Sequence, residues 1–229
     1  MLFGFLLGLQ HASEADHLAA VSTLVTERKS LLSSAFVGGV SGLGHMISLL
    51  VVGFFVLLLK FTISQRTENL LEIGIGIMLV LLGLNVLQKI ARGAQIHFHE
   101  HEHNGHVHAH PHTHLNEPQE AHTHHGLSLS SRPFAVGMVH GLEGSAALML
   151  LVIPTIDSRL VGLLYILIFG VGLVGGMMLM SLLVGLLLHF TALHFNRANL
   201  LLRCVAGLLS VGLGLFIVYE KGFAEKAII

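Results

Sequence analysis

The stretch GLQHASEADH, residues 8–17, places four ionisable side chains inside an apolar N-terminal segment. These side chains are His11, Glu14, Asp16 and His17. Ionisable residues within a membrane-spanning helix are costly, and they almost always line a pathway, a proton relay or a binding site. The interpretation of the stretch therefore depends on whether residues 1–25 cross a membrane.

The composition of the chain is that of a membrane protein. Of its 229 residues, 53% are hydrophobic and 11% are charged, and the mean hydropathy is +0.79. A soluble domain has about 25% charged residues. Since about 20 apolar residues cross a bilayer core, six segments are long enough: 1–25, 32–59, 68–91, 133–154, 160–188 and 199–220. The sequence predicts an all-α, polytopic membrane protein with six transmembrane helices, and a net charge of −1 argues against nucleic-acid binding.

Lys and Arg divide unequally between the two sides that six spans define. Seven fall on one side: Arg28, Lys29, Lys89, Arg92, Arg132, Arg197 and Arg203. Five fall on the other: Lys60, Arg66, Arg159, Lys221 and Lys226. Cytoplasmic loops carry the excess of positive residues. The bias places the loop between spans three and four in the cytoplasm and both termini outside.

The two halves of the chain contain a repeated motif. Gly8-x-x-His11-x-x-Glu14 aligns with Gly137-x-x-His140-x-x-Glu143 at an offset of 129 residues. Weaker matches pair Ser48-Leu-Leu-Val51 with Ser181-Leu-Leu-Val184, and Gly76 and Gly83 with Gly207 and Gly214. We expect two three-helix repeats, 1–92 and 133–229, joined by the loop 93–132. An odd number of spans per repeat inverts the second repeat, and inverted repeats bind substrate near the midplane between them.

The side chains of the repeated motif suit a metal cation. On a regular helix His11, Glu14 and His17 form one stripe, whereas Asp16 points away, so that Asp16 either orients a ligand or marks a distorted helix. Imidazole and carboxylate groups together suit Ni²⁺, Co²⁺ and Zn²⁺. Neither Lys nor Arg occurs in residues 1–25 to neutralise the carboxylates, so a cation or protons must do so. Metal binding releases protons from such ligands, and exchange of a divalent cation for protons is the expected mechanism.

Candidate ligands also occur outside the first segment. His140 and Glu143 are the candidates in the second half. His45 is a weaker one, because a single intramembrane histidine also serves as an interhelical hydrogen-bonding group.

The pattern His11-x4-Asp16-His17 resembles the H-x4-D-H signature of the nickel/cobalt transporter family, which consists of secondary permeases for transition metals. The stretch Gly137-Met-Val-His140-Gly-Leu-Glu143 resembles the motif of the short, six-span, urease-accessory-type branch. The resemblance implies that His11, Asp16 and His17 recognise the metal, with Ni²⁺ as the first expected substrate and Co²⁺ the next. It also implies a multi-pass protein of the bacterial plasma membrane, and nickel metallochaperones or urease and hydrogenase maturation proteins as partners.

The loop between the two halves is rich in histidine. Residues 97–125 contain 12 of the 18 histidines: His97, His99, His101, His103, His106, His108, His110, His112, His114, His122, His124 and His125. High polarity and two prolines predict disorder. Neutral imidazoles bind divalent metals and release them when protonated near their pKa of about 6.5. We interpret the loop as a metal buffer or collector.

Other functions fit part of the pattern. The chain fits an exporter, or a carrier of zinc, iron or manganese, since the ligand types overlap. An accessory membrane subunit that hands nickel to a maturation partner would also carry a histidine loop. A membrane metalloenzyme is disfavoured, because the sequence contains neither His-Glu-x-x-His nor a plausible nucleophile–base pair in either motif. We therefore do not expect an enzyme.

Overall fold

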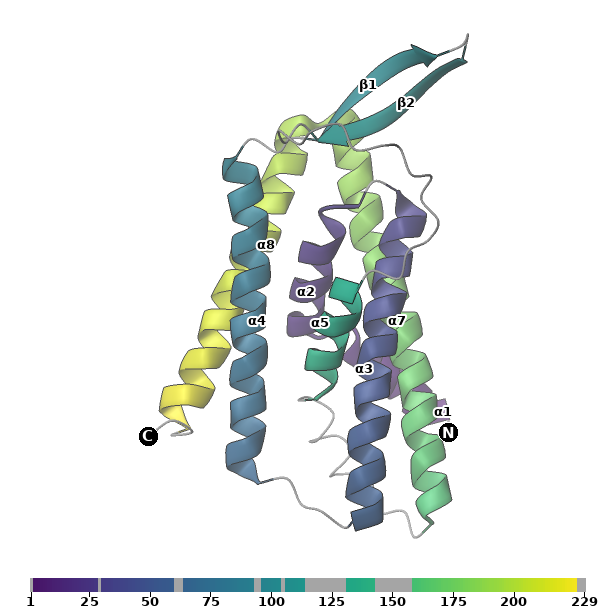
Figure 1. Cartoon of the computed structure of the whole chain (residues 1–229), viewed down its shortest axis with the longest axis vertical. Helices are drawn as coiled ribbons and strands as arrows, with labels where there is room; N and C mark the ends of the chain where they lie inside the picture. Colours follow the sequence, from purple (N-terminus) through teal and green to yellow (C-terminus); the bar gives the residue numbers. More distant parts are fainter. Residues whose placement is uncertain are drawn as a thin grey trace.

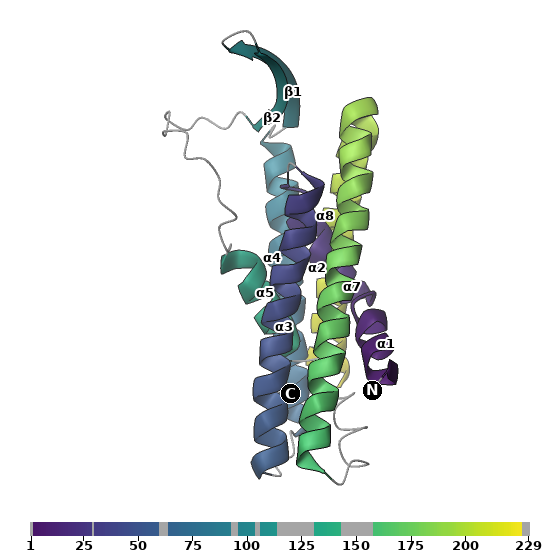
Figure 2. The same cartoon turned by 90° about the vertical axis from the view of Figure 1, so that its right-hand side faces the viewer.

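Four long helices run along the length of the molecule (Figures 1 and 2). The computed structural model describes residues 2–28, 30–59, 64–92, 96–103, 106–113, 131–142 and 158–225. Within these ranges α3 (Leu31–Leu59), α4 (Gln65–Ala91), α7 (Arg159–His194) and α8 (Asn196–Tyr219) are long and apolar enough to cross a membrane. A short π-helical turn, η2 (Glu220–Ala224), extends α8. The architecture is that of a polytopic helical membrane protein.

The first expected span is two short helices instead of one. Helix α1 (Leu2–His11) ends where the ionisable stretch begins, and three residues separate it from α2 (Ala15–Val25). Ser13 ends α1 by donating from both its amide and its hydroxyl to the carbonyl of Gln10, at 2.9 and 2.6 Å. Glu14 has an extended backbone, φ −65° and ψ 154°, and occupies the N-cap of α2. Serine favours such interruptions because its hydroxyl competes for backbone partners.

The second half begins with α5 (Ser131–Gly141). Residues 143–157 lie outside the described ranges. They include Glu143 and the second half of the expected span 133–154. Helix α5 ends one residue after His140, and α1 ends at His11 itself. The equivalent histidines of the repeated motif therefore both lie in the last turn of a short helix.

Part of the histidine-rich loop forms a hairpin. Strands β1 (Ile96–His103) and β2 (His106–Thr113) pair antiparallel, with Ile96 opposite Thr113 and His103 opposite His106. We expected disorder across this loop. His114, His122, His124 and His125 lie outside the described residues.

The short helices pack on the long ones through glycines. A side chain at Gly8 of α1 would overlap the carbonyl of Phe169 in α7, and one at Gly137 of α5 would overlap the carbonyl of Ser41 in α3. In the reverse direction, Gly172 of α7 faces the carbonyl of Phe5, and Gly44 of α3 faces that of Phe134. Small residues let membrane helices approach to backbone contact. The α1–α7 contact thus has the same design as the α5–α3 contact.

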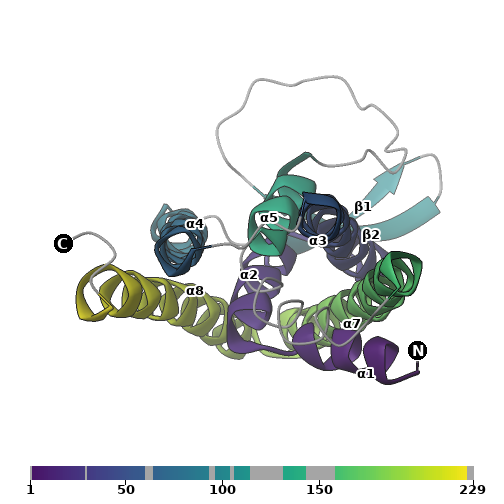
Figure 3. The same ribbon diagram turned by 90° about the horizontal axis from the view of Figure 1, so that it is seen from below.

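Helices α4 and α8 form a second pair beside this group (Figure 3). Gly76 faces the carbonyl of Gly214, and Gly83 faces the carbonyl of Gly207. Ser210 donates its hydroxyl to the carbonyl of Leu79 at 2.8 Å. The four glycines are those that the sequence comparison had aligned, and they meet across one antiparallel interface.

Helix α2 occupies the middle of the molecule. Figure 3 shows it surrounded by α3, α5, α7 and α8. On one side α2 packs with α7 in an apolar cluster that includes Val21, Val25 and Leu173. On another it packs with α4 through Ala20, Leu24 and other residues of a second cluster. The face of α2 that carries His17 and Ala20 is consequently buried.

Two glycines of α7 test the close packing of α1. Gly172→Ala puts a methyl group onto the carbonyl of Phe5, whereas nothing lies within 4 Å of a Cβ at Gly175. Overpacking costs about 1–3 kcal/mol. We expect Gly172→Ala to lower the Tm of the detergent-solubilised protein by about 5 °C, as measured by thermal unfolding. Gly175→Ala, the matched control, should not lower it; equal losses in both variants would refute the packing argument.

Candidate metal centre

Four histidines from four helices meet beside the break between α1 and α2. His11, His17, His45 and His140 are each no more than 3% exposed. The ring of His17 is the central one, with its centroid 4.6 Å from that of His11, 5.1 Å from that of His45 and 4.8 Å from that of His140. Helix α1 contributes the first, α2 the second, α3 the third and α5 the fourth. The centre therefore draws on both halves of the chain.

Asp16 brings a carboxylate into the same cluster. Its Oδ2 lies 3.0 Å from Nδ1 of His17 and 3.4 Å from Nε2 of His140. The side chain is 22% exposed. Two overlapping groups result, one of His11, His17 and His45 and one of Asp16, His17 and His140, and the ligand atoms within each group lie within 4.8 Å of one another.

These separations are close to those of ligands on one ion. Two atoms that are each about 2.1 Å from a metal lie about 3.0 Å apart at an octahedral angle and about 3.4 Å apart at a tetrahedral angle. Nε2 of His17 and Nδ1 of His45 are 3.4 Å apart. This distance is long for a hydrogen bond.

Most of the ring nitrogens lack a hydrogen-bond partner among the described residues. They are both nitrogens of His11, Nδ1 of His17, Nε2 of His45 and Nε2 of His140. Nδ1 of His17 lies at ion-pair distance from Asp16 but without the geometry of a hydrogen bond. Leaving a buried polar atom without a partner costs about 1–3 kcal/mol. Nδ1 of His11 and Nε2 of His140 also lie at ion-pair distance from a carboxylate oxygen, at 2.9 and 3.4 Å. Nε2 of His11 and Nε2 of His45 have neither kind of partner among the described residues.

The helix ends add a favourable electrostatic environment for a cation. His11 and His140 lie in the last turns of α1 and α5, where the helix dipole is negative. Asp16 lies in the first turn of α2, where the dipole is positive and stabilises a carboxylate. Broken helices whose ends face a cation are the usual ion sites of membrane transporters.

The break in the helix changes the predicted ligand arrangement. The expected stripe of His11, Glu14 and His17 on a continuous helix is wrong, because the chain is not helical between α1 and α2. Glu14 contacts His11 at 2.9 Å but is 51% exposed. Asp16, which a straight helix would turn away, joins the cluster. Of the two explanations for Asp16, the distorted helix is the one that the structure shows.

His45 is the residue to which sequence reasoning gave too little weight. It is fully buried and contacts the central imidazole of His17. Its neighbour Gly44 allows α5 to approach α3 closely. The sequence feature that could have indicated His45 is a histidine next to a glycine in an apolar helix.

A salt-bridge network connects the other end of α2 to both ends of the histidine-rich loop. Glu27, two residues after α2, lies 2.8 Å from Nζ of Lys89 and 3.6 Å from Arg132. Lys89 is in the last turn of α4, before the loop, and Arg132 is in the first turn of α5, after it. The helix that carries Asp16 and His17 is thus fastened where the loop leaves and re-enters the bundle.

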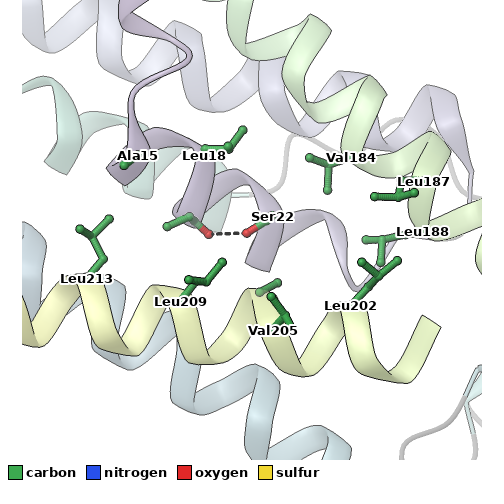
Figure 4. A pocket seen from close by; sticks show the side chains of 12 residues that line it. Ala15, Leu18, Ser22, Val184, Leu187, Leu188, Leu202, Val205, Leu209 and Leu213 are labelled. Atoms are coloured by element: carbon green, nitrogen blue, oxygen red, sulfur yellow. Dashed lines mark hydrogen bonds between the residues drawn. The ribbon is translucent and has the colours of Figure 1, made fainter. Parts of the chain in front are cut away.

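A cavity of about 380 Å³ lies between α2, α7 and α8 (Figure 4). Its lining is apolar apart from Ser22, whose hydroxyl donates to the carbonyl of Ala19 at 2.9 Å. The cavity offers no ligand to an ion. The histidine cluster, rather than this cavity, is the candidate metal centre.

Comparison with known proteins agrees with the geometry. The family model described as "High-affinity nickel-transport protein" (NicO) matches residues 1–218. Urease accessory protein UreH of Bacillus sp. (strain TB-90) is 34% identical over 225 residues, which cover 98% of this chain and 92% of that protein. No solved structure matches the chain significantly.

Two plant proteins are similar over only part of their length. Chloroplast protein FOR GROWTH AND FERTILITY 1 of Arabidopsis thaliana is 30% identical over 96% of this chain and 59% of its own length. Chloroplast protein FOR GROWTH AND FERTILITY 2 of the same plant is 26% identical over 96% of this chain and 56% of its own length. The family model covers nearly the whole chain and confirms the resemblance that the two histidine motifs indicated. The chain is an integral membrane protein that belongs to the NicO family of high-affinity nickel-transport proteins.

Proposed function

We propose that the protein carries a divalent transition-metal cation across the bacterial plasma membrane, Ni²⁺ first and Co²⁺ next. The substrate ion binds His11, Asp16, His17, His45 and His140 between the two halves of the chain. The observation that carries this proposal is the burial of four imidazoles, two of which contact one carboxylate. Five of their ring nitrogens lack a hydrogen-bond partner among the described residues. Glu14 contacts His11 from an exposed position, and Glu143 is its counterpart in the repeated motif.

Exchange for protons follows from the ligand chemistry. Imidazole and carboxylate groups must be unprotonated to hold a metal, so binding displaces protons. The ion leaves when the ligands are reprotonated on the other side. Direction of transport is set by the gradients, and import of nickel is the direction we propose.

The packing supports two inverted repeats. Phe5 and Gly8 in α1 have the contacts that Phe134 and Gly137 have in α5, an offset of 129 residues. Their partners Phe169 and Gly172 in α7 correspond to Ser41 and Gly44 in α3, an offset of 128. Contacts that recur with the roles of the halves exchanged are those of a two-fold axis. The match of Ser48 with Ser181 in the sequence pairs α3 with α7 at an offset of 133 residues. The contacts favour an offset that is five residues smaller. Alternating access would then consist of rocking one repeat against the other.

The hairpin β1–β2 of the histidine-rich loop lies at the end of the bundle where α4 and α7 end (Figure 1). Arg28, Lys89, Arg92, Arg132 and Arg197 lie at helix ends on this side. The positive-inside rule makes it the cytoplasmic side. The loop collects ions there, and the Glu27 network holds its attachment points to α2.

A second candidate is an accessory subunit that hands nickel to urease maturation proteins. The similarity to a protein named urease accessory protein supports it. An accessory subunit would bind nickel at the loop but would move none across vesicles that contain this chain alone.

Substitutions of Asp16 and Glu14 test which of these two neighbouring carboxylates binds the ion. We expect Asp16→Asn to raise the Kd for Ni²⁺ by about tenfold or more, because Asp16 contacts two histidines and is mostly buried. Glu14→Gln should change the Kd less, since its side chain is half exposed and contacts only His11. Calorimetric titration of the purified protein measures both values. Both variants keep the histidine-rich loop, so a difference between their Kd values reports binding by the helices. A larger loss in Glu14→Gln would reverse the assignment.

Transport tests the centre directly. In proteoliposomes, His11→Ala, His17→Ala and Glu143→Ala should abolish Ni²⁺ uptake, because each removes a group from the ion's path. His194→Ala is the matched control, since this exposed histidine at the end of α7 lies outside the cluster and contacts the carbonyl of Phe190 and neighbouring rings. Competition by Co²⁺ and the response to an imposed pH gradient report the substrate range and proton exchange. Wild-type flux in the His17→Ala variant would contradict the site, and no flux in the wild type would favour the accessory subunit.

Deletion of residues 97–125 tests the collecting role of the loop. We expect the half-saturating Ni²⁺ concentration to rise while the maximal rate stays unchanged, because the loop supplies ions but does not form the midplane centre. Replacing its twelve histidines with serine controls for the shortened connection. A loss of maximal rate in the serine variant would show that the loop takes part in translocation.

A further inference from the structure

The two ring nitrogens of His17 face different neighbours. Nε2 lies 3.4 Å from Nδ1 of His45, within the group of His11, His17 and His45. Nδ1 lies 3.0 Å from Oδ2 of Asp16, within the group of Asp16, His17 and His140. Both groups are complete sets of three ligands, and His17 is their shared member.

We propose that the centre has two alternative metal positions on opposite sides of the His17 ring and that they hold one ion between them. The imidazole position consists of His11, His17 and His45, and the carboxylate position consists of Asp16, His17 and His140. This inference rests on the proposed function, because it specifies how that site holds its substrate ion.

Mutual exclusion follows from the chemistry of the neutral ring. A neutral imidazole has one nitrogen that carries hydrogen and one that offers a lone pair. An ion in the imidazole position takes the lone pair of Nε2 and leaves the hydrogen on Nδ1, which lies 3.0 Å from Oδ2 of Asp16. An ion in the carboxylate position takes the lone pair of Nδ1 and leaves Nε2–H to donate to His45. The two bound states contain the same number of protons and differ only in which nitrogen of His17 carries one.

The two positions differ in charge and in place. The imidazole position is built by α1, α2 and α3 from neutral groups that are at most 3% exposed. The carboxylate position includes His140 of α5 and the charge of Asp16, which is 22% exposed. The carboxylate offsets half of the charge of a divalent ion, so most of the bound ion should be in the carboxylate position at equilibrium. A shift from one position to the other moves the ion between ligands of the first half and a ligand of the second, as rocking of the halves would require.

Binding constants test the proposal quantitatively. Two exclusive positions require the reciprocal Kd of the wild type to equal the sum of the reciprocal Kd values of the two variants that each keep one position. His45→Ala keeps the carboxylate position, and His140→Ala keeps the imidazole position. With Co²⁺ as the probe, we expect one ion per protein, a Kd within about twofold of wild type for His45→Ala, and a loss of about tenfold or more for His140→Ala.

The experiment uses the full chain with its twelve loop histidines replaced by serine in every form. Visible absorption of bound Co²⁺ reports the ligand set: the spectra of His45→Ala and His140→Ala should differ, and the wild-type spectrum should be a weighted sum of the two. Asp16→Asn should reproduce the His140→Ala spectrum, which guards against a misfolded variant. His17→Ala should bind no ion in the helices.

Three results would overturn the proposal. Two Co²⁺ ions per protein would show independent sites. A loss of tenfold or more in both His45→Ala and His140→Ala would show one site that uses all ligands together. Identical Co²⁺ spectra of His45→Ala and His140→Ala would also show a single site. These results leave the proposed function intact, whereas absence of Co²⁺ and Ni²⁺ binding by the wild type would defeat the proposed function itself.

Discussion

The interruption of the N-terminal helix at residues 12–14 is the feature on which the candidate metal centre depends. A continuous helix would point His11 and Asp16 to different sides, whereas the break lets α1 end at His11 and α2 begin anew with Asp16 and His17 in its first turn. The same break exposes helix ends inside the protein, where their dipoles favour a cation beside His11 and a carboxylate at Asp16. One local event thus supplies both the ligand geometry and the electrostatics.

Close glycine contacts make this interruption possible. Helix α1 has only ten residues, and an isolated helix of this length has little stability of its own. Gly8 and Gly172 let it lie against the backbone of α7, which replaces the continuity lost at the break by packing. Gly137 and Gly44 do the same for α5 on α3. Both short helices therefore hold their terminal histidine in place through contact with a long helix of the other half.

The interior and the loop use histidine in different ways. In the candidate centre, four imidazoles are buried and oriented by packing, and two of them contact one carboxylate. In the loop, many histidines follow one another with short spacings, which suits exchange among interchangeable ligand sets. The Glu27 network joins the two regions, because it fastens the helix of Asp16 and His17 to both ends of the loop.

The sequence by itself determined the class of protein, the long helices, the family and most of the residues that meet in the candidate metal centre. A long apolar segment predicts a membrane helix from its length alone, and charge inside such a segment is informative because it is so costly. His11, Asp16, His17 and His140 could therefore be named without a structure. Only the tertiary structure decided that residues 1–25 form two helices, that Asp16 rather than Glu14 joins the cluster, and that His45 lies in contact with His17. These features depend on backbone contacts between helices far apart in the chain, and no periodicity within one segment records which faces of two segments will meet.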